Sequence, residues 1–172
     1  ARHAMTYSKG ASAGDERAVI AQCEEEAGRV ANLRGRKKGG EKISAIRLEL
    51  NNVMESSCGV YREQTSMQAG VIATAQLRGR VADLRLEDES KVFNTELITA
   101  LELQNMVEVA ETLAVSAAHR KESRGAHTCK DFKTRDDQNY LYHTMVHHDP
   151  AGPRLGKKDV VLGKWVPEER KY

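Results

Sequence analysis

A long stretch of helix-forming residues, Thr95 to His119, constrains the fold of this 172-residue chain more than any other feature. Asn94 precedes it and can cap a helix, because its side-chain oxygen can accept a hydrogen bond from a free backbone N–H of the first turn. A helix that is apolar on most sides is usually buried. We therefore predict the central helix of a bundle, with Glu102, Glu108 and Glu111 on its exposed side. Its apolar side chains lie around most of the circumference: Leu97, Ile98, Leu101, Val107, Val109, Leu113 and Val115.

Three amphipathic segments precede this helix and predict three more helices. Residues 12–15 have the spacing of a capping hydroxyl and an acid, and the apolar period after them predicts a helix to about Leu33. A second helix is expected from Glu41, and Thr65 to Gln68 has the form of a capping box that opens a third helix, to about Leu86. The stripe of the second helix has alternating gaps of three and four: Ile43, Ile46, Leu50, Val53, Ser57 and Val60.

The composition changes after the long helix. Residues Lys121 to Asn139 are dense in charge and lack an apolar period, which predicts an irregular segment. Two strand-like runs follow, Tyr140 to Val146 and Asp159 to Val166, with a Pro- and Gly-containing turn region between them at Asp149 to Gly156. We expect these two runs to form a small β-hairpin.

These elements predict a mainly α fold. We expect an antiparallel three-helix bundle, like a spectrin repeat, with an extra N-terminal helix and a C-terminal β-hairpin tail. The bundle and the extra helix take up residues 15–119, and residues 120–172 form the charged loop and the hairpin. A single chain of this length can bury roughly 70% of its unfolded surface, so one core suffices.

Composition excludes several classes of function. The 27 basic and 25 acidic side chains leave a net charge of +2, which is too balanced to attract nucleic acid or an anionic membrane. Cys23, Cys58 and Cys129 are odd in number and outside any CxxC pair, which favours a reducing compartment over a disulfide framework or a zinc site. No apolar run approaches the roughly 18 residues of a membrane span, so we expect a soluble chain without direct membrane insertion.

The sequence offers no catalytic, cofactor or metal site. It contains neither GxGxxG after a strand nor a phosphate-binding loop. His143 and His147 share one face of a predicted strand, but roughly 13 Å would separate them, which is too far for one metal ion. His148 follows them directly. We interpret Cys58 as a buried small thiol.

One charged segment, residues 120–139, is unlike an ordinary surface. Arginine forms paired bonds to carboxylates, so its interspersed charges can pin an irregular loop. The alternative is a surface for a ligand or a partner, and the residues alone leave both interpretations open. Eleven residues of this segment and the following strand are candidates for an interface: Arg120, Glu122, Ser123, Arg124, His127, Asp131, Arg135, Asp136, Asp137, Asn139 and His143.

At these residues the chain resembles the flavoprotein subunits of succinate dehydrogenase and fumarate reductase. That family carries an R-x-E-S-R-G-A-H signature, then an R-D-D-x-N block and a histidine. The residues that match in order are Arg120, Glu122 to His127, Asp131, Arg135 to Asp137, Asn139 and His143. Cys58 to Arg62, Phe93 to Leu97 and Leu101 to Leu103 look like further family segments, so the resemblance runs from about Glu41 onward. Cys129 and Lys133 depart from the family, which usually has arginine and often proline there.

The resemblance implies the C-terminal helical domain of such a subunit, which is not itself catalytic. FAD and the substrate-binding residues belong to domains that precede this region in the family. The implied partners are the subunit's own FAD-binding domain and an iron–sulfur subunit that passes electrons to quinone. The implied location is cytoplasmic, peripheral to the inner membrane through partner subunits.

The resemblance also bears on the N-terminal segment and on the charged loop. We interpret residues 1–14 as the end of the preceding flavin-domain segment, since Ala1 is not an initiator methionine and indicates a cut edge. The charges of the Arg120 to Asn139 loop lack evident partners in the chain, so we expect the loop to be an interface. Two alternatives remain: an independent helical protein-interaction module, and the C-terminal domain of an L-aspartate oxidase.

Overall fold

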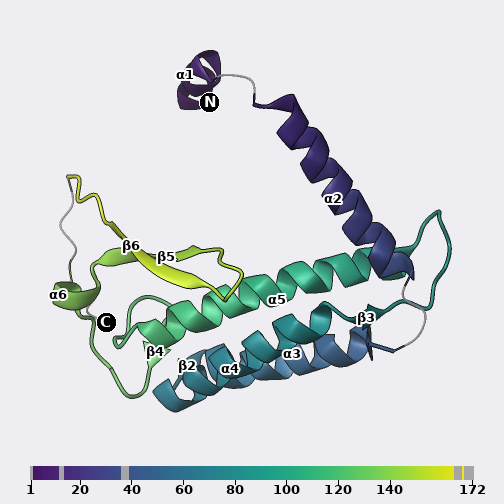
Figure 1. Ribbon diagram of the computed structural model, residues 1–172. Helices are drawn as coiled ribbons and strands as arrows, with labels where there is room; N and C mark the ends of the chain where they lie inside the picture. The colour runs from purple at the N-terminus through teal and green to yellow at the C-terminus, as the bar shows by residue number, and fades with distance from the viewer. Residues whose placement is uncertain (1, 12–13, 36–38, 165–167, 169–172) are drawn as a thin grey trace.

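The computed structural model describes residues 2–11, 14–35, 39–164 and 168, and it is mainly helical (Figure 1). The main helices are α2 (Glu16–Gly35), α3 (Ile43–Cys58), α4 (Gln64–Val81) and α5 (Thr95–His119), with shorter α1 (Arg2–Gly10) and α6 (Asp137–Tyr140). The strands are β1 (Glu41–Lys42), β2 (Tyr61–Arg62), β3 (Leu84–Arg85), β4 (Thr128–Cys129), β5 (Tyr142–His147) and β6 (Arg154–Asp159).

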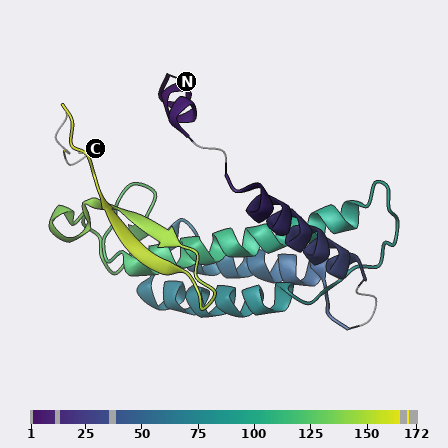
Figure 2. The same ribbon diagram turned by 45° about the horizontal axis from the view of Figure 1, so that its top comes forward.

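Helices α3, α4 and α5 lie lengthwise against one another and form the predicted three-helix bundle (Figure 2). Helix α5 has the predicted bounds and packs against both other helices; because α3 and α4 also pack against each other, α5 is no more central than α4. Asn94 caps it as predicted, since its side chain accepts from the Leu97 amide at 2.7 Å. The main core comprises Leu33, Ile43, Ile46, Leu50, Leu77, Val81, Leu84, Leu86, Ala100, Leu103, Val107 and Ala110.

Helix α5 is less evenly buried than predicted. Ile98 and Val109 are 55% and 64% exposed, so one face of the helix is apolar but open. Glu111, which we expected on the exposed side, is 5% exposed. Its carboxylate lies 3.0 Å from Nε of Arg78 on α4, and this ion pair compensates the burial.

The start and the end of α4 correct two predictions. The helix begins at Gln64, and the Thr65 capping box does not form; the Glu63 cap position makes no side-chain cap bond. The Gln64 amide instead donates to the Asp131 carboxylate at 2.6 Å. The helix ends at Val81 rather than Leu86, because the chain turns to pair β3 with β1 in parallel, Leu84 opposite Glu41.

The stripe on α3 is largely as predicted, with Ile43, Ile46, Leu50 and Ser57 buried. Val60 is 75% exposed, because α3 ends at Cys58 and Val60 no longer shares its period. Gly70 on α4 lies against Ser57, and a Cβ at Gly70 would overlap that side chain. The small residue therefore permits close packing of the two helices.

Helix α2 confirms the predicted extra N-terminal helix, and it extends away from one end of the bundle (Figure 1). Only Leu33 near its end is buried, and Arg29 donates to Gln104 of α5 at 2.7 Å. Ser12 of the expected capping pair lies outside the described residues; the Arg17 amide bonds to the Asp15 carboxylate at 3.0 Å.

The predicted β-hairpin forms from β5 and β6, which pair antiparallel from Tyr142 opposite Asp159 to His147 opposite Arg154. We predicted the second strand at Asp159 to Val166, but β6 ends at Asp159; Val166 itself lies outside the described residues. The turn is shorter than expected, because the Asp149 side chain accepts from the Ala151 amide and Gly152 adopts a φ of 134°.

Across the described ranges, no helix is both long and apolar enough to cross a membrane.

Candidate functional site

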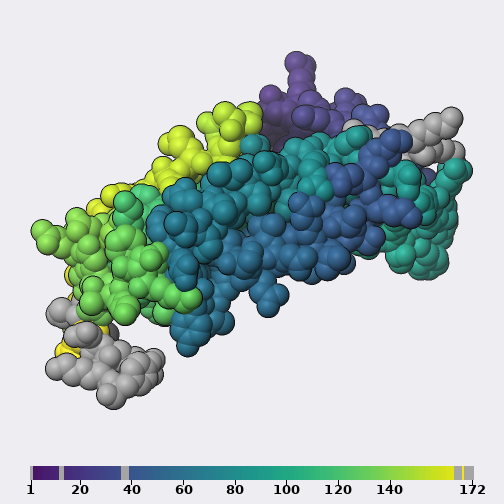
Figure 3. All heavy atoms as spheres, turned by 90° about the horizontal axis from the view of Figure 1, so that it is seen from below, coloured from purple at the N-terminus to yellow at the C-terminus, as the bar shows by residue number. Residues whose placement is uncertain are grey.

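The charged segment after α5 folds onto one end of the bundle, where its green surface adjoins the blue ends of the neighbouring helices (Figure 3). Strands β2 and β4 fix it there by pairing in parallel, Tyr61 opposite Thr128 and Arg62 opposite Cys129. The Lys130 amide also donates to the Arg62 carbonyl at 2.8 Å. The loop is thereby attached to the α3–α4 connection.

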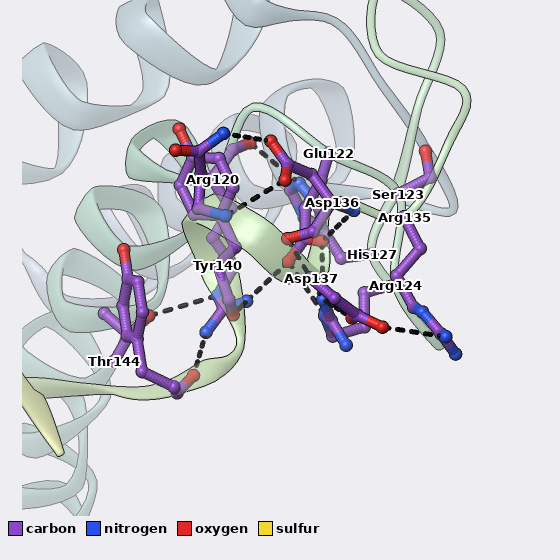
Figure 4. A network of polar contacts seen from close by, with 12 residues as sticks. Arg120, Glu122, Ser123, Arg124, His127, Arg135, Asp136, Asp137, Tyr140 and Thr144 are labelled. Atoms are coloured by element: carbon purple, nitrogen blue, oxygen red, sulfur yellow. Dashed lines mark hydrogen bonds and ion pairs between the residues drawn. The ribbon is translucent and has the colours of Figure 1, made fainter. Parts of the chain in front are cut away.

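Glu122 is the centre of the loop (Figure 4), and its side chain is fully buried. Oε1 accepts from Arg120 Nη1 at 2.6 Å and from Arg124 Nε at 2.9 Å. Oε2 accepts from Arg124 Nη2 and from the Asp136 amide, both at 2.9 Å. Burial raises the pKa of Glu122, but the bonds from two guanidiniums and one amide outweigh burial and hold that pKa below its usual value.

Our expectation that these charges lack partners within the chain is therefore wrong. Arg124 also bonds to Asp137 at 2.7 Å, and Arg135 approaches the other oxygen of Asp137 at 2.8 Å. The hydrogen bond from Arg124 lowers the pKa of Asp137 despite partial burial. The salt-bridged loop is the interpretation that the contacts support, although such a loop can still present an outer surface to a partner.

Arg120 connects the loop to the elements that follow it. Nη1 donates to the Tyr140 carbonyl at 3.1 Å, Nη2 donates to the Tyr142 carbonyl, and Nε donates to Thr144 Oγ1 at 3.1 Å. Its guanidinium also lies 5.1 Å from the centroid of the Tyr142 ring. One arginine therefore positions α6 and β5 against the buried carboxylate.

Three further predicted residues, Ser123, Asp131 and Asp136, hold the backbone in place through side-chain hydrogen bonds. Ser123 Oγ donates to the Phe132 carbonyl at 2.7 Å and accepts from the Cys129 amide at 2.8 Å. Asp131 accepts from the first amide of α4, as described above. Asp136 caps α6 by accepting from the backbone and the side-chain amide of Asn139 at 3.0 and 2.8 Å.

His127 lies between two arginines. Its Nδ1 lies 2.9 Å from Arg62 Nη1, and its Nε2 lies 3.3 Å from the Arg120 carbonyl oxygen. Because a guanidinium only donates and a carbonyl only accepts, the ring is neutral with its proton on Nε2. Burial lowers the pKa of His127, and the nearby positive charge of Arg62 lowers it further.

The thiols correct one expectation. Cys129 is the buried one, 1% exposed, in a small apolar cluster with Met67, Ala117 and Ala118. Cys58, which we expected to be buried, is only half-buried at the edge of the same cluster.

An open groove of about 480 Å³ lies beside the loop. Arg62, Arg120, Arg124, His127 and His143 line it together with apolar residues such as Leu113, and no carboxylate is among its lining residues. Sequence reasoning identified every one of these polar residues except Arg62, which stands in a segment noted only for its family resemblance. The groove is suited to an anionic group.

Neither metal chemistry nor nucleophilic catalysis is suggested by this geometry. Among the described residues, no three His, Cys, Asp or Glu side chains are grouped to hold a metal ion. His143 and His147 both lie on β5 and both are exposed. The charged groups of the loop are largely bonded to one another, which is the arrangement of a salt-bridged loop.

Known proteins are similar to this chain in sequence and in fold. Residues 47–172 match a protein family described as fumarate reductase flavoprotein C-term. The chain is 42% identical over 159 residues to a fumarate reductase flavoprotein subunit of Haemophilus influenzae, covering 92% of this chain and 26% of that protein. It is 42% identical over 109 residues to a succinate dehydrogenase flavoprotein subunit of Coxiella burnetii, covering 63% of this chain and 19% of that protein.

The fold is shared with a solved structure of Escherichia coli quinol fumarate reductase. The TM-score is 0.86 at 38% sequence identity, over 94% of this chain and 28% of the other. The chain thus spans about a quarter of the length of the Haemophilus influenzae and Escherichia coli proteins.

Proposed function

Because this chain belongs to the family of C-terminal domains of fumarate reductase and succinate dehydrogenase flavoprotein subunits, we propose that it docks onto the FAD-binding part of such a subunit. In this proposal FAD and the succinate or fumarate site lie in that other part, and the present chain stabilises it without taking part in the chemistry. Residues 1–14 end the flavin-binding part, 15–119 are the helical domain, and 120–172 are the loop and hairpin.

The exposed apolar face of α5 is the observation that carries this proposal. Ile98, Met106, Val109 and Leu113 are between 36% and 64% exposed. At 3.6 residues per turn they fall within an arc of about 80°; exposed Glu102 lies in the same arc, so the uninterrupted apolar part is Met106, Val109 and Leu113. An exposed apolar stripe on a helix of a bundle is typical of an interaction surface. Leu113 also lines the cationic groove, so the stripe and the groove form one continuous surface.

The full-length subunit tests this proposal. Val109→Asp places a charge in the proposed interface, and we expect it to lower bound FAD and succinate oxidation by a dye acceptor together. Leu48→Asp on α3, where Leu48 is 62% exposed, is the matched control and should leave both unchanged. Equal behaviour of the two variants would contradict docking through α5.

The wider partners follow from the same proposal. The flavoprotein subunit would pass electrons to an iron–sulfur subunit and through it to quinone, at the cytoplasmic side of the inner membrane. Co-purification of the full-length subunit with an iron–sulfur protein tests this. A lone full-length subunit that reduces quinone directly would contradict it.

Two alternatives are separated by simple observations. Assays of the full-length protein on succinate and on aspartate distinguish this family from the L-aspartate oxidases; the names of the relatives favour succinate. An independent interaction module requires its own start codon, whereas a reading frame that continues upstream into a flavin-binding domain excludes it.

A further inference from the structure

The groove beside the loop holds guanidinium donors that the described part of the chain does not use. Arg62 bonds through Nε to the Gly59 carbonyl at 3.0 Å and through Nη1 to His127. Arg124 bonds through Nε and Nη2. Within residues 39–164, Arg62 Nη2 and Arg124 Nη1 have no hydrogen-bond partner. Two guanidiniums that line one groove can therefore each offer a donor to an incoming group.

The charge of the groove is unbalanced at its surface. Three arginines line it. Two carboxylates outside the lining pair with them: Glu122, which is fully buried with both oxygens bonded, and Asp137, which lies 2.7 Å from Arg124. Arg62 itself makes no ion pair with a carboxylate among the described residues. Hydrogen bonds between a guanidinium and an ionised oxygen are strong, so the group that fits the groove is an anion whose oxygens accept one bond from each of these two arginines.

We propose that this groove binds an acidic side chain, aspartate or glutamate, from the flavin-binding part of the same polypeptide. This inference rests on the proposed docking, and it identifies the polar contact between the two parts as one between arginine and a carboxylate. Leu113 makes the groove continuous with the apolar stripe of α5, so one partner surface can cover both. A covalently linked partner also has an effective concentration in the millimolar range or above, which favours it over free ligands.

A zero-length cross-link tests the contact directly. In the full-length subunit, Arg62→Lys keeps the positive charge and supplies an amine, and a carbodiimide joins an amine to a carboxylate in contact with it. We expect a cross-link from position 62 to an aspartate or glutamate in the part of the polypeptide that precedes this chain. Arg80→Lys is the matched control, because Arg80 on α4 lies 2.8 Å from Glu49 of α3 and should link within the chain.

Chemical modification of the unaltered protein provides a second measurement. A dicarbonyl reagent should modify Arg62 at least about tenfold more slowly in the full-length subunit than in this chain alone, since uncovering a buried charge pair is costly. Arg80, which pairs with Glu49 of α3, should react equally in both. Equal reactivity of Arg62 in the two proteins, or a cross-link from position 62 only to Glu122 or Asp137, would overturn the proposal.

The outcomes separate this inference from the proposed function. If Val109→Asp lowers FAD content while Arg62 stays reactive, the chain docks but the groove takes no part. If Val109→Asp leaves the FAD content unchanged and Arg62 is equally reactive in both proteins, the proposed docking itself is wrong. A cross-link to another subunit or to a second copy would overturn the assignment of the partner.

Discussion

Arg124 holds Glu122 by two parallel hydrogen bonds inside the loop after α5, with Nε and Nη2 each 2.9 Å from a carboxylate oxygen. Because Glu122 is fully buried, removing its charge leaves Arg120 without its counter-ion and leaves Arg124 with Asp137 alone. We predict that Glu122→Gln lowers the free energy of unfolding by about 3–5 kcal/mol, measured by urea denaturation. Glu63→Gln, which breaks an exposed pair with Lys130, is the control and should have little effect.

The same carboxylate predicts a loss of stability in acid. The folded-state pKa of Glu122 is lowered from its ordinary value of 4.5, so the unfolded chain binds a proton more readily. The stabilisation is fully present above pH 4.5 and is lost as the pH falls through the folded pKa. In Glu122→Gln the part of the acid dependence of the unfolding free energy that comes from this carboxylate should disappear. A variant with the unchanged acid slope of the parent would show that other carboxylates account for it.

His127 predicts a second, milder dependence on pH. Its folded pKa is lowered from 6.5 by burial and by the charge of Arg62, so the unfolded chain again binds the proton more readily. Stability should fall as the pH drops below 6.5 toward the folded pKa. The pKa of His119 is lowered by burial, so this residue contributes in the same range. We expect the free energy of unfolding, measured in urea from about pH 7 to about pH 5, to change less with pH in His127→Gln than in the parent. Exposed His143→Gln is the control.

Because α3 and α4 approach closely at Gly70, we expect that position not to tolerate a larger side chain. A Cβ there would overlap Ser57, so Gly70→Ala should destabilise the chain by about 1–3 kcal/mol, measured by thermal unfolding. Gly79→Ala lies on the same helix with open space around its Cβ, and it should stabilise by up to about 1 kcal/mol. If both substitutions shifted the midpoint alike, the close approach would not be real.

The parts of the fold that sequence reasoning predicted correctly depend on local signals. The bounds of α5 follow from the Asn94 cap and the period of the residues after it, and both act within a few residues. The hairpin was predicted from signals that are also local: two strand-like runs and the Pro- and Gly-containing turn region between them. The position of β6 was missed, because the side-chain bond of Asp149 and the backbone of Gly152 decided the length of the turn.

The parts that were missed depend on partners that are distant in sequence. Glu111 was expected to be exposed, and it is buried because Arg78 of another helix neutralises it. Asp131 caps α4 from 67 residues away, which no pattern around Thr65 could indicate. The candidate loop residues were identified as a set. Their mutual pairing through Glu122 was not predicted, because an irregular segment has no period from which to infer which side chains turn inward.

The central claim, that this chain is a docking domain whose chemistry lies elsewhere, is tested most directly by titrating the purified chain with FAD and following the visible absorbance and fluorescence of the flavin. We expect the flavin spectrum to stay that of free FAD, and we expect the chain not to oxidise succinate with a dye acceptor. Stoichiometric binding of FAD, or succinate oxidation by the chain alone, would contradict it.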